Sequence, residues 1–399
     1  MLNIWPAELP VYIYGSSHPS KEAIDNVVAA LKLNHRVSVI CLQNTSTPAW
    51  ETFASLMEHP FPELTHLSIM PFIPMRNVVP SAFLGRSAPC LRDLSLIGIP
   101  FPALPELLLS ATDLVRLQYD NVPHCGYISP QATVTSLSVL TRLESLSLTF
   151  PLPQDLPDRA IRISPPHTRT LLPALTYLCL RGVPEYMEDL VSQIDAPLLE
   201  GIEITLFHQE VLEVSQLAKF ICRVDSLSLI DRAEISFHDD SISVGLSQEL
   251  QLPGIDPKTL KINLDCYEMN LRLSYLAQFC ASFLPTLSPF ECLHILVQCR
   301  CIPWRRVVDN PDPQWLELLR LFNAVKDLRL DEIVAPHAVP VLGRLPAEQV
   351  SEVLPALEIV FISGLNPFGP VKEAISEFTD ARQLSGRPVS IHKWEQTML

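Results

Sequence analysis

Residues 89–100 read PCLRDLSLIGIP, and this segment sets the interpretation of the whole chain. Its apolar residues Leu91, Leu94 and Leu96 follow the pattern apolar-x-x-apolar-x-apolar. The alternation at its end predicts a strand that buries one face and turns the other outward. Gly98 and Pro100 then predict a turn, because glycine tolerates positive φ and proline fixes the direction in which the chain leaves.

The same pattern recurs along the chain, typically at intervals from 23 residues (Leu91 to Leu114) to 35 residues (Phe290 to Val325). About twelve copies begin at Val37, Leu64, Leu91, Leu114, Leu143, Leu175, Leu199, Val224, Leu260, Phe290, Val325 and Leu357. Leucine-rich repeats have a period of roughly 20–29 residues. The longer intervals here leave room for a helix in each unit, as the crossover between parallel strands requires.

Helix-spaced apolar residues fill several intervals between the expected strands, namely 50–59, 105–112, 185–194, 271–283, 313–324 and 371–381. Helices are wider than strands, so a stack of strand–helix units must curve. The sequence therefore predicts an α/β solenoid, a leucine-rich-repeat horseshoe with a parallel concave sheet and convex helices. Residues 1–34 would form an N-terminal lead-in or cap, 35–365 the repeats, and 366–399 a C-terminal helix–strand cap. An α/β domain with parallel strands but no repeat stack is the alternative.

A turn signature follows several of the expected strands, in Gly98-Ile99-Pro100, Asn121-Val122-Pro123, Gly182-Val183-Pro184 and Gly364-Leu365. Glycine and asparagine tolerate the left-handed backbone of such a turn, and the next apolar residue can point inward. The common leucine-rich consensus has Asn or Cys at this apolar position. The unit is therefore a variant without the polar ladder of that consensus.

The overall charge limits the classes of partner. With 29 Lys+Arg and 44 Asp+Glu the net charge is −15, which leaves no basic stripe for nucleic acid. No apolar stretch reaches the roughly 20 residues that span a bilayer, and Met1–Pro10 lacks a signal-peptide pattern. The ten cysteines form no CxxC pair. We expect reduced thiols, a cytoplasmic or nuclear location, and neither nucleic acid nor membrane as a partner.

Three stretches resemble one known family. They are WPAELPVYIYG followed by AIDNVVAALKLNHRVSVICL at the start, the SLIGIP and CLRGVP turns in the middle, and ARQLSGRPVSIHKW at the end. Together they resemble the F-box-like leucine-rich-repeat proteins of mushroom-forming (basidiomycete) fungi. The resemblance covers nearly the whole chain. It implies repeats that hold the substrate of a cullin–RING ubiquitin ligase.

The chain departs from this family at its start, because Trp5–Pro10 is too short to be the helical F-box that docks on a Skp-type adaptor. We therefore expect adaptor binding only if an F-box precedes Met1. The sequence would belong to an F-box-less relative or to a gene model that lacks its first exon.

Candidate catalytic or metal-binding groups are few, and no GxGxxG, GxxxxGK[ST] or GxSxG motif is present. His238-Asp239-Asp240 could form a metal or acid–base site, but we interpret it as a solvated turn. Cys299-Arg300-Cys301 with His294 could bind zinc, but the spacing fits no tetrahedral site and a core role is preferred. Arg305-Arg306 is interpreted as solvated surface, and Trp304 as core or a surface anchor. We predict no catalytic, cofactor-binding or metal-binding residue.

The x residues of each strand are the candidate partner-binding positions, because they share the concave face. We single out His66, Asp93, Arg116, Gln118, Tyr177, Glu203, Lys261, Asp327 and Arg329. Of these, Arg116, Tyr177 and Arg329 are the strongest candidates, since Tyr and Arg dominate interface energetics. Serines at 68, 95, 147 and 228 could leave room for a partner segment, or could merely suit a tightly curved wall. The expected function is protein–protein interaction as the substrate-recognition repeats of a ubiquitin-ligase receptor. The alternatives are an orphan repeat protein and an enzyme on a repeat scaffold.

Overall fold

A computed structural model describes residues 9–15, 20–150, 168–207, 214–248, 259–266, 271–284, 290–298, 313–346, 348–350, 352–364 and 370–394. The chain divides into two compact units, unit 1 over Met1–Gly201 and unit 2 over Ile202–Leu399. Each unit combines a mostly parallel sheet with helices, so the fold class is α/β, as predicted. Within the described ranges, every helix is too short or too polar to cross a membrane.

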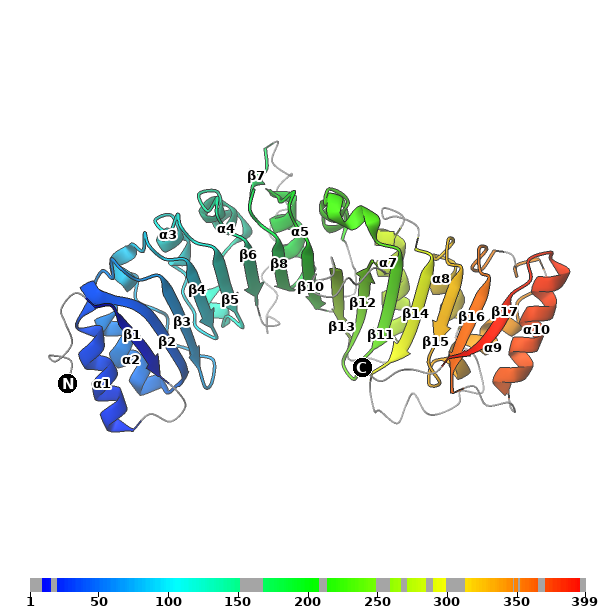
Figure 1. Cartoon of the computed structure of the whole chain (residues 1–399), viewed down its shortest axis with the longest axis horizontal. Helices are drawn as coiled ribbons and strands as arrows, with labels where there is room; N and C mark the ends of the chain where they lie inside the picture. The colour runs from blue at the N-terminus through cyan, green and yellow to red at the C-terminus, as the bar shows by residue number, and fades with distance from the viewer. Residues whose placement is uncertain are drawn as a thin grey trace. The chain divides into compact units, whose positions relative to one another are not determined.

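The sheet of unit 1 is formed by strands that pair in chain order (Figure 1). They are β1 (Val11–Gly15), β2 (Val37–Thr45), β3 (His66–Pro71), β4 (Asp93–Ile97), β5 (Arg116–Asp120), β6 (Ser145–Thr149) and β8 (Tyr177–Gly182). Every pairing from β1–β2 to β6–β8 is parallel. A separate two-stranded parallel sheet joins β7 (Thr170–Leu171) to β9 (Ile194–Asp195). The first expected strands are thus confirmed, and β1 is an additional one.

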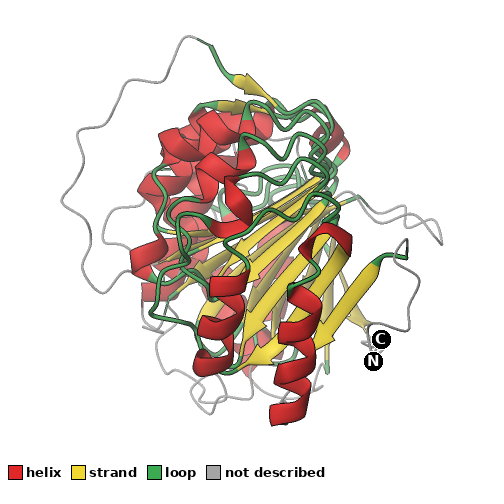
Figure 2. Cartoon of the chain, turned by 90° about the vertical axis from the view of Figure 1, so that its left-hand side faces the viewer, coloured by secondary structure: helices red, strands yellow, loops and turns green. Residues whose placement is uncertain are grey.

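The connections between these strands carry the helices that parallel pairing requires. They are α1 (Lys21–Leu31), η2 (Asn34–Arg36), α2 (Thr47–Leu56), η3 (Phe83–Arg86), α3 (Leu104–Leu108), η4 (His124–Gly126), α4 (Pro130–Leu137) and α5 (Pro184–Ser192). Figure 2 shows the helices gathered on one side of the sheet in the unit nearest the viewer, with the strands forming the other side. The helices near 50–59, 105–112 and 185–194 were predicted, whereas α4 was not.

The alternating apolar residues form two rows that run across the strands of unit 1. Leu94 pairs with Leu67 on one side and Leu117 on the other, and the row continues to Leu146 and Leu178. All five side chains are at most 3% exposed. Burial of one leucine contributes about 1.5–3 kcal/mol. The rows therefore hold the sheet to the helices and leave the intervening side chains on the opposite face.

The predicted turn chemistry is confirmed at three of its four positions. Gly98, Asn121 and Gly364 have positive φ values of 68°, 50° and 60°. Gly182 does not adopt this conformation, because it still belongs to strand β8. After two of the turns the apolar residues are fully buried, at Ile99 and Val122. Val183 is only half-buried, and Leu365 lies outside the described residues.

Unit 2 contains strands β10 (Gly201–Phe207), β11 (Arg232–Phe237), β12 (Ser241–Ser247), β13 (Thr259–Asp265), β14 (Cys292–Val297), β15 (Asp327–Leu330), β16 (Ile359–Ser363) and β17 (Ser390–Trp394). Its helices are α6 (Ser215–Cys222), η5 (Asp225–Leu229), α7 (Arg272–Phe283), α8 (Gln314–Leu319), α9 (Ala335–Gly343) and α10 (Pro370–Leu384). The predicted helices at 271–283, 313–324 and 371–381 correspond to α7, α8 and α10. Helices α6 and α9 were not predicted.

The order of strands in unit 2 departs from a regular repeat array. It is β10-β13-β12-β11-β14-β15-β16-β17, so the block β11–β13 runs in reverse of chain order. Strand β12 pairs antiparallel with both β11 and β13, whereas β11 pairs parallel with β14. The expectation of a wholly parallel sheet is therefore wrong in this block, and β12 was not predicted at all.

The repeat strand predicted from Val224 is also wrong, because residues Asp225–Leu229 form the 3₁₀ helix η5. Leu227 within this helix is buried, and so are Val224 and Ile230, which flank the helix. They are spaced by three, which matches the three residues per turn of a 3₁₀ helix as well as it matches the start of the repeat pattern.

A buried arginine fixes the turn of the β11–β12 hairpin. Arg272, at the start of α7, is 0% exposed. Its guanidinium donates to the carbonyl of Cys266 (3.0 Å), to that of His238 (2.6 Å) and to that of Asp239. Burial and then the positive charge of Lys261 lower the pKa of His238. The segment His238–Asp240 is thus the turn between two strands.

Candidate functional site

The helix-free face of unit 1 carries the polar side chains that alternate with the buried leucines. In one row His66, Asp93, Arg116, Ser145 and Tyr177 are register neighbours from β3 to β8. In the next row lie Ser68, Ser95, Gln118, Ser147 and Cys179. The structure therefore brings five of the nine predicted positions onto one continuous surface.

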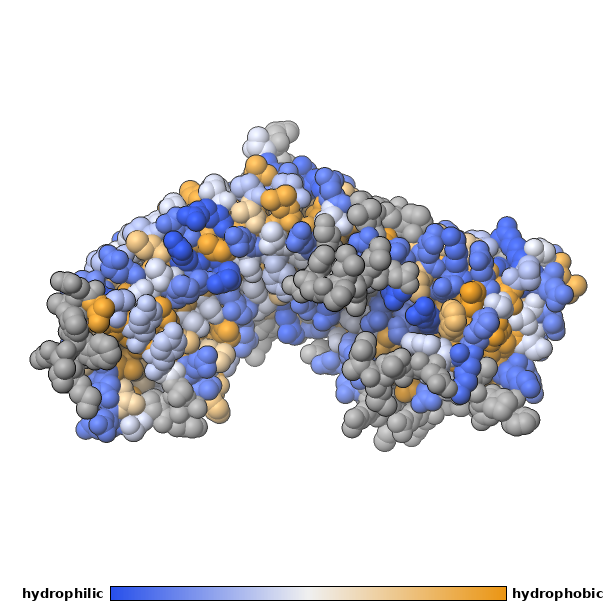
Figure 3. All heavy atoms as spheres, in the orientation of Figure 1, coloured by the Kyte–Doolittle hydropathy of each residue, from blue (hydrophilic) through white to orange (hydrophobic). Residues whose placement is uncertain are grey.

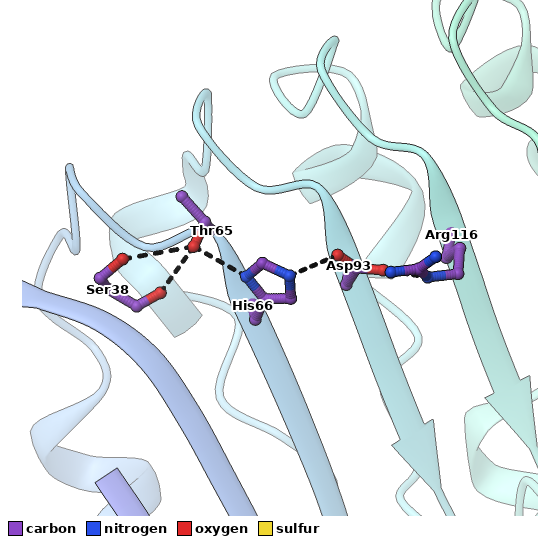
Figure 4. A network of polar contacts seen from close by, with 5 residues as sticks. All are labelled: Ser38, Thr65, His66, Asp93 and Arg116. Carbon is purple, nitrogen blue, oxygen red and sulfur yellow. Dashed lines mark hydrogen bonds and ion pairs between the residues drawn. The ribbon is translucent and has the colours of Figure 1, made fainter. Parts of the chain in front are cut away.

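A chain of hydrogen bonds and ion pairs crosses this face from β2 to β5 (Figure 4). The Thr65 hydroxyl donates to the Ser38 carbonyl (3.0 Å) and lies 2.8 Å from Nδ1 of His66. Nε2 of His66 lies 2.7 Å from Oδ2 of Asp93, and Nε of Arg116 pairs with the other carboxylate oxygen. One carboxylate thus ties two neighbouring strands to its own strand.

The order hydroxyl–imidazole–carboxylate invites comparison with a nucleophilic triad, in which the hydroxyl gives its proton to the imidazole. Here the hydroxyl of Thr65 has a competing acceptor in the carbonyl of Ser38. A His66 protonated on Nε2 alone donates to Asp93 and accepts from Thr65. A doubly protonated His66 donates to both, and Thr65 then donates to Ser38. The contact from Nε2 of His66 to Asp93 persists in either state, which suits a structural bridge between β3 and β4.

A shallow open cavity of about 440 Å³ lies on the same face beside this network. Its lining comes from β4, β5, β6 and β8 and comprises Asp93, Leu94, Ser95, Arg116, Leu117, Gln118, Asp120, Ser145, Ser147, Tyr177 and Cys179. The serines keep the cavity open, because their side chains are short. Cys179 is half-buried on this face. The volume falls in the range of about 300–1,000 Å³ that is typical of binding pockets.

Hydrogen bonds between side chains organise the centre of the cavity. The hydroxyl of Ser95 donates to Oε1 of Gln118 (2.9 Å). Nε2 of Gln118 donates to Oδ2 of Asp120 (2.6 Å), and the hydroxyl of Ser147 donates to its Oδ1 (2.7 Å). Asp120 is the last residue of β5 and lies beyond the repeat pattern of Leu114, Leu117 and Tyr119. The structure makes it the acceptor at which this hydrogen-bonded group ends.

Tyr177 lies at the wall of the cavity and is 40% exposed. A Cβ atom at Gly201 would approach the Tyr177 ring to 2.9 Å at Cδ2. One edge of the ring, at Cδ2 and Cε2, therefore lies close to the bare backbone of the glycine. This contact holds the aromatic surface in place beside the polar floor.

Two of the predicted residues of unit 2 also come together. Nζ of Lys261 on β13 lies 3.4 Å from Oε1 of Glu203 on β10. Nδ2 of Asn263 donates to the same oxygen (3.3 Å) and to the hydroxyl of Thr205 (3.2 Å). This ion pair is partly exposed on both sides, so its contribution to stability is small.

A second polar row crosses β11 and β14–β17. Glu234, His294, Arg329, Phe361 and His392 are successive register neighbours. Nδ1 of His294 lies 3.4 Å from Oε2 of Glu234. This hydrogen bond holds the pKa of Glu234 below its usual range, although burial opposes the shift. The guanidinium of Arg329 lies 5.3 Å from the centre of the Phe361 ring.

Trp394, at the end of β17, contacts the same row. Its ring centre lies 4.8 Å from that of His294, edge to face. Strand β17 pairs with β16, yet His294 belongs to β14. Figure 1 shows β17 slanting toward the foot of β14. The final described strand thus reaches the row through its last side chain.

The remaining predicted positions have less to connect them. Asp327 is half-buried at the start of β15 and joins neither cluster. Trp304, Arg305, Arg306 and the Cys299–Cys301 segment lie outside the described residues. In the part of the chain that is described, no three His, Cys, Asp or Glu side chains form a metal-binding group. Phe361, Glu234 and Trp394 were missed, because no repeat pattern marks which x residues meet across strands.

Comparison with known proteins yields no match, either to a family model or to a curated protein. The function of the chain must therefore be inferred from the geometry of its two units.

Proposed function

We propose that the chain is a leucine-rich-repeat solenoid whose helix-free sheet face binds a partner protein. The observation that supports this function is the cavity on unit 1, which opens between Asp93, Arg116 and Tyr177 on a face that no described helix of that unit covers. Side chains on paired strands are held by their neighbours, so little conformational entropy is lost when a partner binds. The mixture of hydrophilic and smaller apolar areas in Figure 3 suits a partner recognised through polar contacts.

The resemblance to F-box-like proteins extends this proposal to a role in ubiquitination. In that role the partner would be the substrate of a ligase, and the repeats would hold it. Residues 1–399 alone should then fail to retain a Skp-type adaptor in a pull-down. Retention of the adaptor would contradict our expectation and would indicate a docking surface other than an F-box.

Affinity capture followed by two sets of variants tests the binding face. A partner captured by the native chain should be lost with Arg116→Ala and Tyr177→Ala together, because both side chains line the cavity. Arg142→Ala is the matched control. Its side chain is 57% exposed and paired with Asp113, whereas that of Arg116 is 65% exposed and paired with Asp93. Loss of the partner with the control alone would place the binding surface elsewhere.

A further inference from the structure

The charge of Asp120 distinguishes the cavity from the rest of the face. Its carboxylate is half-buried and accepts hydrogen bonds from Gln118 and Ser147, which are both uncharged. Among the described residues no Lys, Arg or His forms an ion pair with it. Asp93, in contrast, is held by Arg116 and His66. Asp120 is therefore a fixed negative charge on an open surface, with no counter-ion from the described part of the chain.

The charged groups that line the cavity favour a cation. Asp93 and Asp120 contribute −2 and Arg116 contributes +1, which leaves −1. An anionic group would meet two carboxylates, of which only Asp93 is neutralised by Arg116. A positively charged group would instead gain an ion pair with Asp120 in a partly desolvated position, where a charge interaction is stronger than in bulk water.

The aromatic wall points to the same class of ligand. The Cδ2–Cε2 edge of the Tyr177 ring lies beside Gly201, and the side chain stays 40% exposed. Cations bind favourably over the face of a tyrosine ring. Ser95 and Ser147 leave room beside the ring for the methylene stem that carries the charge of a lysine or arginine.

We propose that this cavity takes one basic side chain, a lysine or an arginine, from the bound partner. Its stem would lie over Ser95 and Ser147, and its charged end would reach Asp120 beside the Tyr177 ring. The inference rests on the proposed function, because it specifies what the sheet face recognises. The serines at 95, 145 and 147 then have a role, since larger side chains would close the cavity.

Titration of the full chain with short peptides tests this inference. The probe is the acetylated and amidated peptide Gly-Ser-Lys-Ser-Gly, with Gln or Glu in place of Lys for comparison. In protein labelled with ¹⁵N, the NMR signals of the backbone amides of Gln118 and Asp120 report on the cavity. We expect saturable shifts of both signals with the lysine peptide and none with the other two. Equal binding of the glutamate peptide, or no saturable shift with the lysine peptide, overturns the inference.

Two variants identify the groups responsible. Asp120→Asn keeps the size of the side chain and removes its charge, so binding of the lysine peptide should weaken about tenfold. Asp113→Asn, which removes a carboxylate outside the cavity, should bind as the native chain does. Tyr177→Leu should also weaken binding, and it leaves the hydrogen bonds of Asp120 in place. Native affinity in both cavity variants would overturn the inference.

The outcome for the inference is separable from that for the proposed function. A captured partner that is lost with Arg116→Ala and Tyr177→Ala but retained by Asp120→Asn would leave the binding face intact as a proposal. Only the recognition of a basic side chain would then fail. A partner that is retained both by the Arg116→Ala and Tyr177→Ala double variant and by Asp120→Asn would contradict the proposed function and the inference alike.

Discussion

At the scale of single residues, the two units use charge in different ways. On the face of unit 1 a carboxylate such as Asp93 binds partners on two neighbouring strands. In unit 2 the buried guanidinium of Arg272 binds backbone carbonyls and has no carboxylate among its hydrogen-bond partners in the described residues. Buried carbonyls must be hydrogen-bonded, so this arginine replaces the backbone donors that a hairpin turn lacks.

Replacement of Arg272 should therefore destabilise the chain strongly. In Arg272→Met the carbonyls of Cys266, His238 and Asp239 lose their donor, which we expect to cost about 2–4 kcal/mol of unfolding free energy. Urea denaturation measures this change. Arg344→Met is the control, because Arg344 is exposed, and should change stability by less than about 0.5 kcal/mol. Equal stability of the two variants would show that water satisfies the three carbonyls.

Glu234 should make the stability of the chain sensitive to acid. Its pKa is held below the ordinary value of 4.5 chiefly by the hydrogen bond from His294. A carboxyl group with a lowered folded pKa stabilises the fold above its unfolded pKa, and this contribution is lost as the pH falls through the folded value. The native chain should therefore lose more stability below about pH 4.5 than Glu234→Gln does.

Denaturation at a series of pH values checks this difference. Glu352→Gln, at an exposed glutamate, should follow the native profile. If Glu234→Gln also follows the native profile, the contact with His294 does not stabilise the ionised carboxylate.

At the scale of elements, close contact between helices α9 and α10 depends on a glycine. A Cβ atom at Gly343 would lie 2.7 Å from the carbonyl oxygen of Ala374 and 2.9 Å from its Cα atom. Backbone atoms cannot move aside as a flexible side chain can. Gly343→Ala should thus separate the helices and lower the unfolding free energy by about 1–3 kcal/mol.

A second glycine provides the control for this contact. At Gly245 on β12 a Cβ atom would lie 3.9 Å from its nearest neighbour, which is an ordinary contact. Gly245→Ala should leave the thermal unfolding midpoint close to that of the native chain or raise it. A fall as large as that of Gly343→Ala would mean that a backbone conformation suited to glycine, rather than a contact of the new Cβ atom, governs both positions.

Strand positions could be predicted from sequence wherever alternation and burial coincide. The pattern at Leu91, Leu94 and Leu96 identifies β4 because a period of two belongs to strands alone. Val224, Leu227 and Leu229 have the same apolar spacing, yet Asp225–Leu229 form a 3₁₀ helix, so long-range packing overrides the local pattern there. Strand β12 alternates apolar residues at Ile242, Val244 and Leu246, but it lacks the apolar-x-x-apolar start of the repeat pattern, so a search for repeats does not find it.

The candidate site was predictable only in part. Alternation places His66, Asp93 and Arg116 on one face, but it does not say which residues of different strands become neighbours. That information lies in the register, which depends on the lengths and packing of the connections. Asp120 and Phe361 acquire their roles through such neighbours, so the sequence pattern could not identify them.

At the scale of the whole molecule, the division into two units predicts where a core defect is felt. In a stack of repeats, as we propose for this chain, the stability of each strand–helix segment depends mainly on the segments next to it. Leu94→Ala removes a side chain that is 1% exposed, at a cost of about 2–5 kcal/mol. Hydrogen exchange followed by mass spectrometry should show faster exchange in β3, β4 and β5, with native protection in β14, β15 and β16.

A surface leucine provides the comparison for this experiment. Leu109, which follows α3, is 50% exposed, so Leu109→Ala should leave exchange in β3 to β5 unchanged. Faster exchange in β14 to β16 of Leu94→Ala would show that the chain unfolds as a single cooperative body instead.

The reversed block β11–β13 also constrains how the gene could change in length. Where strands pair in chain order, as from β2 to β6, duplication or deletion of one strand–helix segment preserves the direction and sequence of all the others. Within the block, β12 pairs antiparallel with both neighbours, so its removal alone would bring β11 beside β13 with the wrong connection. The three strands can therefore be inherited, copied or lost only together. Related genes of different length should differ by whole strand–helix segments outside residues 232–265 and retain that block intact.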